Sequence, residues 1–131
     1  MNEQALCTAA LQARKKAYVP YSHFAVGAAL LTADGKIYDG CNIENAAYSV
    51  TVCAERVALF KAVSDGVRNF IALAVAGGAQ NIPATATTPC GVCRQALAEF
   101  CTADMPIYLV NENADPVKTT LGALLPSAFT L

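Results

Sequence analysis

The stretch FAVGAALLTADGKIYDGC, residues 24–41, indicates a β-hairpin in the first third of the chain. Residues 24–31 form an apolar run, Asp34-Gly35 is a typical tight-turn pair, and residues 36–41 give a second short strand. Two such runs separated by a turn signal are typical of two strands joined by a tight turn. We therefore expect a sheet that contains an antiparallel pair.

Helical and extended segments alternate around this hairpin. Before it, apolar residues at helical spacing predict a helix over about residues 2–17, which Pro20 prevents from continuing. After it, the pattern predicts a helix over 51–64, a strand over 70–76, a helix that opens at Cys90, a strand over 106–110, a short strand near Val117 and a helical turn over 121–125. This order predicts an α/β fold with a mixed sheet. Because we find no linker or repeat, we expect a single domain, residues 1–131.

Two finer expectations concern the middle of the chain. In the helix over 51–64, the spacing of Val57, Phe60 and Val63 predicts that these side chains face inward. The strand over 70–76 is expected to end at Gly77-Gly78, because adjacent glycines commonly mark a turn.

Composition excludes two classes of protein and favours an oligomer. The formal net charge of −1 argues against a basic nucleic-acid binder, and no apolar run approaches the ~18–20 residues that span a bilayer. Charged residues make up 15% of the chain, whereas about 25% is typical, and hydrophobic residues make up 55%. A short chain with so few charges cannot cover its surface with polar groups, so we expect interfaces between copies.

The cysteine content indicates the compartment and points to a metal or redox site. Six cysteines occur in 131 residues, and the first 21 residues show no secretory signal. We therefore expect a reducing cytoplasm, in which some cysteines are metal ligands or redox groups. The others, Cys7, Cys41 and Cys101, are expected to be buried thiols.

Three cysteines and one glutamate form a pattern typical of a catalytic zinc site. Cys53 and Glu55 lie near the start of one predicted helix, and Cys90 and Cys93 open another. The positive end of a helix favours thiolate, and three thiolate ligands leave the fourth zinc position open to water. A carboxylate beside that water can accept and return its proton.

Other interpretations of these residues remain open at this point. Cys90 and Cys93 also resemble a thioredoxin-type redox pair, and a structural zinc site could take Cys41, Cys101 or His23 as its fourth ligand. Neither interpretation explains Glu55. Its simplest competing role is to complement the dipole at a helix N-terminus. The joint pattern C-x-E and P-C-x-x-C matches that of the zinc deaminases.

Across nearly its whole length the chain resembles the small, homotetrameric, zinc-dependent cytidine deaminases. The motifs that carry the resemblance are YSHFAVGAA at 21–29, GCNIENAAY at 40–48, CAER at 53–56, PCGVCRQ at 89–95 and LLPSAF at 124–129. The resemblance implies a three-layer α-β-α fold with a mixed five-stranded sheet. It also implies one zinc ion per chain and hydrolysis of cytidine or deoxycytidine to uridine or deoxyuridine and ammonia, through a zinc-bound hydroxide.

The resemblance also assigns roles to single residues. Cys53, Cys90 and Cys93 hold zinc, Glu55 shuttles the proton, and Arg56 hydrogen-bonds the ligand sulfurs. The residues expected to bind substrate are Phe24, Asn42, Glu44, the backbone of Ala54 and Thr88, and Phe129. The competing roles are core packing for Phe24, a turn for Asn42 and Glu44, and an exposed helix position for Arg56. For Arg94 a functional role and an exposed position are equally supported, and His23 is expected to be a surface residue.

Two further expectations follow. Because the negative charge of Glu44 would repel a 3′-phosphate, we expect free nucleosides as substrates, not RNA or DNA. Phe129 is expected to reach into the active site of a neighbouring chain, the alternative being that it caps its own core. The nearest rival function is a deaminase of another cytosine nucleoside, such as blasticidin S. Asn42 and Glu44 favour cytidine.

Overall fold

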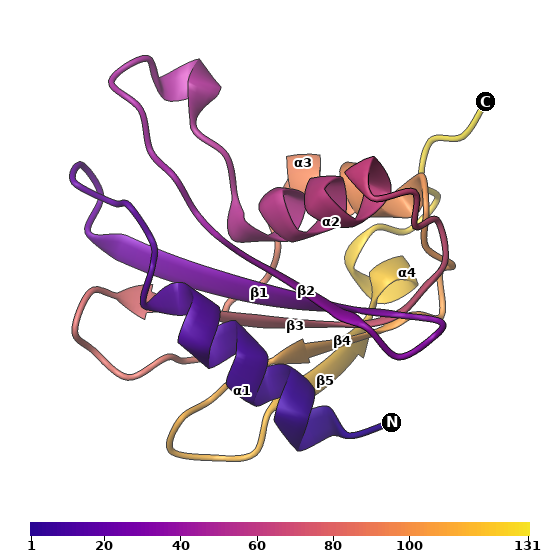
Figure 1. The fold of residues 1–131 in the computed structure, drawn as a ribbon, viewed down its shortest axis with the longest axis horizontal. Helices are drawn as coiled ribbons and strands as arrows, with labels where there is room; N and C mark the ends of the chain where they lie inside the picture. Colours follow the sequence, from indigo (N-terminus) through magenta and orange to yellow (C-terminus); the bar gives the residue numbers. More distant parts are fainter.

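The computed structural model describes residues 1–131, and its centre is a five-stranded mixed sheet (Figure 1). The strands lie in the order β2-β1-β3-β4-β5, and only β3 and β4 run parallel to each other. Their bounds are β1 Phe24–Thr32, β2 Ile37–Cys41, β3 Phe70–Ala79, β4 Pro106–Leu109 and β5 Val117–Thr120. The predicted hairpin is therefore present, and its first strand lies between β2 and β3.

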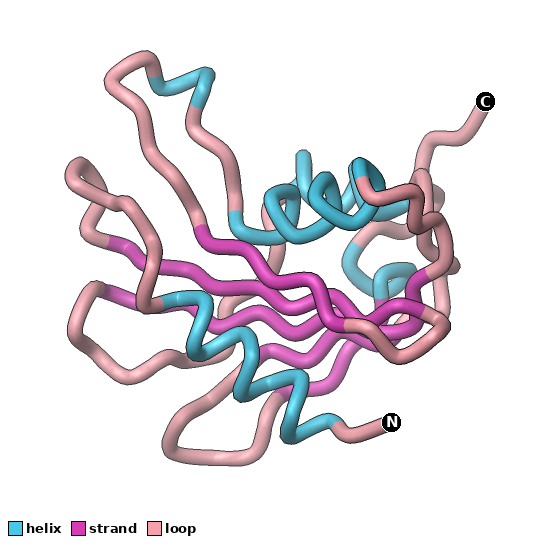
Figure 2. The backbone as a smooth tube through the Cα atoms, in the orientation of Figure 1, coloured by secondary structure: helices cyan, strands magenta, loops and turns pink.

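Helices cover both faces of the sheet, which confirms the three-layer α-β-α architecture. Helix α1 lies on one face, and α2, α3 and α4 lie on the other (Figures 1 and 2). Their bounds are α1 Glu3–Arg14, α2 Ala54–Ser64, α3 Gly91–Ala98 and α4 Leu121–Leu124, and a short 3-10 helix, η1, spans Tyr48–Val50. The long loop that carries η1 projects beyond the sheet (Figure 2). No helix combines the length and apolar character needed to cross a membrane.

Strand β3 shows how the sequence fills two cores at once. Successive side chains of a strand point to opposite faces. Ala72, Ala74 and Ala76 therefore pack toward α1, whereas Leu73 and Val75 pack toward α2 and α3. All five are fully buried. The α1 side is a layer of small side chains, and the other side is a layer of larger ones.

Two glycines let helices approach the sheet closely. A Cβ atom added to Gly27 in β1 would lie 2.1 Å from the carbonyl oxygen of Ala10 in α1. One added to Gly40 in β2 would lie 2.6 Å from both the oxygen of Ala54 and the nitrogen of Ala58 in α2. Gly40 therefore permits the position of the first turns of α2.

This close approach corrects the predicted inward face of α2. Of the three side chains expected to face the core, Phe60 is exposed and Val57 is only partly buried, so the expectation is wrong for these two; Val63 is partly buried and does pack against the core. The face that meets the sheet consists of Ala54, Ala58, Leu59 and Ala62, all fully buried. Mostly alanine fits there because the backbones of α2 and β2 nearly touch at Gly40.

Two boundaries also differ from the sequence prediction. Helix α2 begins at Ala54 rather than near residue 51. Strand β3 continues through Gly77 and Gly78 to Ala79, since both glycines pair with β1. The Thr87 side chain packs over Gly77, at a distance that leaves no room for a Cβ atom. The pair therefore serves close packing within the strand, and it does not end it.

Candidate metal centre and active site

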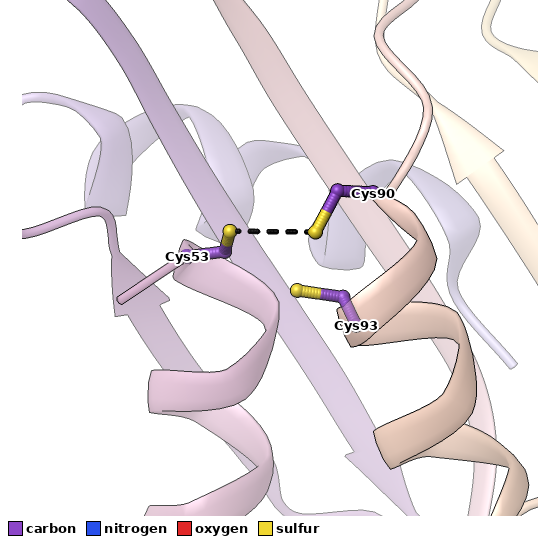
Figure 3. Close-up of side chains that lie close together, drawn as sticks. All are labelled: Cys53, Cys90 and Cys93. Carbon is purple, nitrogen blue, oxygen red and sulfur yellow. Dashed lines mark hydrogen bonds between the residues drawn. The ribbon is translucent and has the colours of Figure 1, made fainter. Parts of the chain in front are cut away.

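Two helix N-termini bring three thiols together. Cys53 is the N-cap of α2, and Cys90 is the N-cap of α3. Both residues have extended backbones, and neither uses its side chain to cap its helix. Both thiols therefore remain free to point toward each other, together with Cys93 from the first turn of α3 (Figure 3).

The spacing of these sulfurs fits a zinc ion. The three Sγ atoms all lie within 4.8 Å of one another, and those of Cys53 and Cys90 are 3.7 Å apart. Two sulfurs at the usual Zn–S distance of ~2.3 Å and a tetrahedral angle would be about 3.8 Å apart. The cluster contains neither His23, Cys41 nor Cys101, so the chain supplies three ligands rather than four. This is the ligand number of a catalytic site, not of a structural one.

The surroundings of the cluster favour thiolate at Cys53. The pKa of Cys53 is lowered to about 5, chiefly by a hydrogen bond from Cys93 and further by one from Arg56. The Nη2 atom of Arg56 lies 3.5 Å from Cys53 Sγ. Interaction with the thiolate raises the pKa of the guanidinium, which therefore stays charged. Arg56 therefore lies within hydrogen-bonding distance of one sulfur of the cluster.

Glu55 is buried next to this cluster. Its side chain belongs to the first turn of α2, and the residue is only 3% exposed. The pKa of this carboxyl group is raised to about 7, chiefly by burial and in smaller part by the negative charge of Cys53. A carboxylate at a helix N-terminus that served only the dipole would normally remain in water. The burial of Glu55 therefore argues against the simple capping role.

Asn42, predicted to bind substrate, lies beside Phe24. Its Nδ2 donates to the Phe24 carbonyl oxygen at 2.9 Å, and its Oδ1 accepts from the Val26 amide at 2.9 Å. The amide thus extends the pairing of β1 beyond the end of β2. It retains one N–H and one oxygen lone pair for a ligand. Phe24 is partly exposed at the start of β1 and is not a core residue.

Glu44 is held by a neighbouring loop. Its Oε1 accepts from the amides of Tyr21 and Ser22 at 3.0 and 3.1 Å. Hydrogen bonds from Ser22, followed by that of Tyr21, lower the pKa of this carboxyl group. Glu44 lines a pocket of about 340 Å³ together with Tyr21, Ser22, Tyr48 and Thr51. Two larger hollows beside α1 contain none of the predicted site residues.

The remaining predicted residues differ in their surroundings. Ala54 is buried at the start of α2, and Thr88 is exposed just before α3. Phe129 is 68% exposed, so the alternative that it caps the core of its own chain is wrong. His23 is exposed as expected. The three remaining cysteines are only partly buried, which corrects the expectation for Cys7, Cys41 and Cys101.

A family comparison agrees with this geometry. The model of the cytidine and deoxycytidylate deaminase zinc-binding region matches residues 1–109. The match includes all three thiols and Glu55. The chain belongs to the cytidine deaminase family.

Individual cytidine deaminases are similar over almost the full chain. The enzyme from Sporosarcina psychrophila is 56% identical over 130 residues, which cover 99% of this chain and 93% of its own. That from Halalkalibacterium halodurans is 52% identical over 131 residues, with coverage of 99% and 96%. A crystal structure of cytidine deaminase from Burkholderia pseudomallei is 48% identical, has a TM-score of 0.88, and covers 98% of this chain and 100% of its own. These similarities do not favour the redox or blasticidin S hypotheses.

Two polar residues of this cytidine deaminase were not resolved by sequence reasoning. Arg94, whose role was left open, donates from Nε to the Pro89 carbonyl and from Nη1 to the Leu124 carbonyl, at 2.7 and 2.6 Å. Gln95, which was not singled out, donates from Nε2 to the Phe129 carbonyl at 3.1 Å. The only available signal was their position directly after Cys93, because their partners in the C-terminal segment, Leu124 and Phe129, lie 30 and 34 residues away.

Proposed function

We propose that this chain hydrolyses free cytidine and deoxycytidine to uridine and deoxyuridine with release of ammonia. In this proposal Cys53, Cys90 and Cys93 hold one zinc ion, and Glu55 is the proton shuttle. The observation that carries the proposal is a cluster of three thiols within 4.8 Å beside a buried glutamate. Full-length similarity to cytidine deaminases supports the same reaction.

In this proposal the protein's own contribution to the reaction is proton transfer by Glu55, whose side chain is buried. Zinc held by three ligands supplies a water molecule whose pKa is lowered toward neutrality. Glu55 would accept a proton from that water and deliver it to N3 of the pyrimidine as the remaining hydroxide adds to C4. It would then carry the proton of the new C4 hydroxyl group to the 4-amino group, which leaves as ammonia. Because Glu55 is buried, its proton passes to the substrate rather than to bulk water.

Arg56 balances charge at the metal. Three thiolates on a divalent ion leave a net charge of −1, which weakens the ion's ability to acidify water. A guanidinium 3.5 Å from Cys53 Sγ draws part of this charge away from the metal. Arg56 therefore assists the acidification of water at the metal without being a metal ligand itself.

Substrate recognition is assigned to the loops around the start of β1. Asn42 and the free Oε2 of Glu44 bind the 3′-hydroxyl of the ribose, and Phe24 lines the base site. Backbone groups of Ala54 and Thr88 read the pyrimidine edge. The hydrogen bonds from Tyr21 and Ser22 keep Glu44 ionised, and its charge disfavours a 3′-phosphate. Free nucleosides are therefore preferred over nucleotides and nucleic acids, as pyrimidine salvage requires.

The active unit is proposed to be a homotetramer in the cytoplasm. Several large apolar side chains are exposed on the isolated chain, among them Tyr48, Val50, Val92 and Phe129. Such groups on a small chain are typical of interfaces between copies. Phe129 then packs on the pyrimidine or its lining in a neighbour's site. A reducing compartment keeps the three thiols available for zinc.

A direct assay tests the proposed reaction. Purified protein loaded with zinc is incubated separately with cytidine, deoxycytidine, cytidine 3′-phosphate and blasticidin S, and ultraviolet absorbance and ammonia are followed. We expect turnover of the first two, with ammonia equal to nucleoside consumed and about one zinc per chain by metal analysis. Faster turnover of blasticidin S, or a metal-free protein with a reversibly oxidised Cys90–Cys93 pair, would overturn the proposal.

A further inference from the structure

Two consecutive side chains of α3 bind the C-terminal segment at two points. Arg94 Nη1 donates to the Leu124 carbonyl oxygen at 2.6 Å, and Gln95 Nε2 donates to that of Phe129 at 3.1 Å. The residue directly before them, Cys93, belongs to the thiol cluster. One helix therefore contacts both the metal centre and the segment 124–129.

The Arg94 contact has a clear physical basis. Leu124 is the last residue of α4, and the final carbonyls of a helix lack partners within the helix. Arg94 supplies a charged donor to this carbonyl, while its Nε donates to the carbonyl of Pro89 at 2.7 Å. Since Pro89 directly precedes Cys90, the Arg94 guanidinium links the end of α4 to the residue just before the first turn of α3, which carries Cys90 and Cys93.

The Gln95 contact acts at the other end of the segment. Between the two anchored carbonyls the chain bends at Ser127, whose φ of 54° is in the left-handed region. The Phe129 side chain is largely exposed, so packing within its own chain does little to fix its position. What holds Phe129 on this chain is the hydrogen bond from Gln95 to its backbone.

We propose that Arg94 and Gln95 are positioning residues that fix the segment 124–129 to α3 and so determine where Phe129 is presented. This inference rests on the proposed role of Phe129 in a neighbouring active site. Through α3, the placement of the aromatic ring is tied to that of Cys90 and Cys93. Any shift of the segment would then alter substrate binding in the neighbour while leaving the local thiol cluster intact.

The main test uses Gln95→Met, which keeps the length and helix propensity of the side chain but removes the donor. We expect the KM for cytidine to rise about two- to ten-fold, the range for losing one hydrogen bond, with kcat and zinc content little changed. Amide hydrogen exchange in residues 125–131 should become faster. Glu99→Gln, at an exposed position just beyond α3, is the matched control and should change neither the KM nor the rate of amide hydrogen exchange.

A double variant separates positioning from general stability. If Gln95 acts through Phe129, the KM of Gln95→Met/Phe129→Ala should equal that of Phe129→Ala alone, whereas independent effects would multiply. Arg94→Lys, which keeps one charged donor, should give faster exchange than wild type but slower than Arg94→Met.

The failures of the two ideas can be told apart. If Phe129→Ala raises KM while Gln95→Met changes neither KM nor exchange, the positioning inference alone is wrong. If Phe129→Ala leaves KM unchanged, the proposed role of Phe129 fails and the inference fails with it, while deamination at the zinc site stands.

Discussion

The Sγ atoms of Cys53 and Cys90 lie 3.7 Å apart, although 37 residues separate them and each begins a different helix. Neither helix creates this pair alone. The pair forms because α2 and α3 pack on the same face of one sheet, with their N-termini adjacent (Figure 3). The metal centre is therefore a product of the tertiary fold.

Removing one thiol should abolish both metal binding and catalysis. Cys90→Ala leaves two sulfurs, too few to hold zinc as the three-ligand site does. We expect zinc content by metal analysis and deamination of cytidine to fall together to background. Cys101→Ala is the matched control, since Cys101 is partly buried and lies outside the cluster. Full zinc occupancy in Cys90→Ala would refute the three-thiolate assignment.

Glu55→Gln should separate metal binding from turnover. The amide has the size of the carboxyl group but cannot accept and return a proton, so kcat should fall by about 10²–10⁴. Zinc content should remain near one per chain because all three thiols are intact. A variant that deaminates cytidine at nearly the wild-type rate would show that another group moves the proton.

The same variant should also change how stability depends on pH. The pKa of Glu55 is about 7 in the folded chain, above its unfolded value of about 4.5, so the folded state binds the extra proton between these values. The stability that protonated Glu55 contributes is full below the lower value and is lost as pH rises through 7. From pH 5 to pH 8, Glu55→Gln should therefore gain about 2–3 kcal/mol relative to wild type. Denaturant unfolding of both proteins at the two pH values measures this difference.

Arg56→Gln should weaken the metal centre without removing a ligand. Loss of the guanidinium beside Cys53 leaves more negative charge on the metal, and changes of this kind cost about 10–100-fold in activity or metal affinity. Arg68→Gln is a matched control: Arg68 donates only to the carbonyls of Val63 and Val67, near the far end of α2. Equal behaviour of the two variants would return Arg56 to the role of an ordinary helix arginine.

Two glycine substitutions should destabilise the fold with different consequences for the metal. Gly27→Ala forces apart α1 and β1, whereas Gly40→Ala displaces the first turns of α2, next to Cys53. Overpacking of this kind costs about 1–3 kcal/mol, which thermal unfolding can detect. Only Gly40→Ala should also lower zinc affinity. Gly91→Ala meets open space and should leave the melting temperature unchanged or raise it.

A mixing experiment tests whether Phe129 acts in a neighbouring site. In hetero-oligomers of Glu55→Gln and Phe129→Ala chains, some sites combine an intact Glu55 with an intact Phe129 from another chain. Activity should then exceed the average of the two parents. Mixing Glu55→Gln with Cys90→Ala is the control, since no site can regain both glutamate and zinc. A flat result in the first mixture would contradict the neighbour arrangement.

Sequence predicted the metal cluster better than it predicted the packing around it. Cys53, Glu55, Cys90 and Cys93 sit in two short motifs, and the joint pattern of these motifs matched that of the zinc deaminases. The buried face of α2 was missed because alanine gives a weak periodic signal and because the close contact at Gly40 is formed between distant segments. The role of Arg94 was left open for a related reason, since its Leu124 partner is 30 residues away.

The alanine layer of β3 determines which substitutions this strand can tolerate. On the α1 side, almost any residue that replaces Ala72, Ala74 or Ala76 is larger than alanine. Such a substitution would overpack the core between β3 and α1. On the α2 side, a smaller residue in place of Leu73 or Val75 would leave a cavity in the core. Substitutions at alternate positions of β3 therefore destabilise the fold in opposite ways, by overpacking on one face and by cavities on the other. A second substitution that relieves one of these effects would not relieve the other.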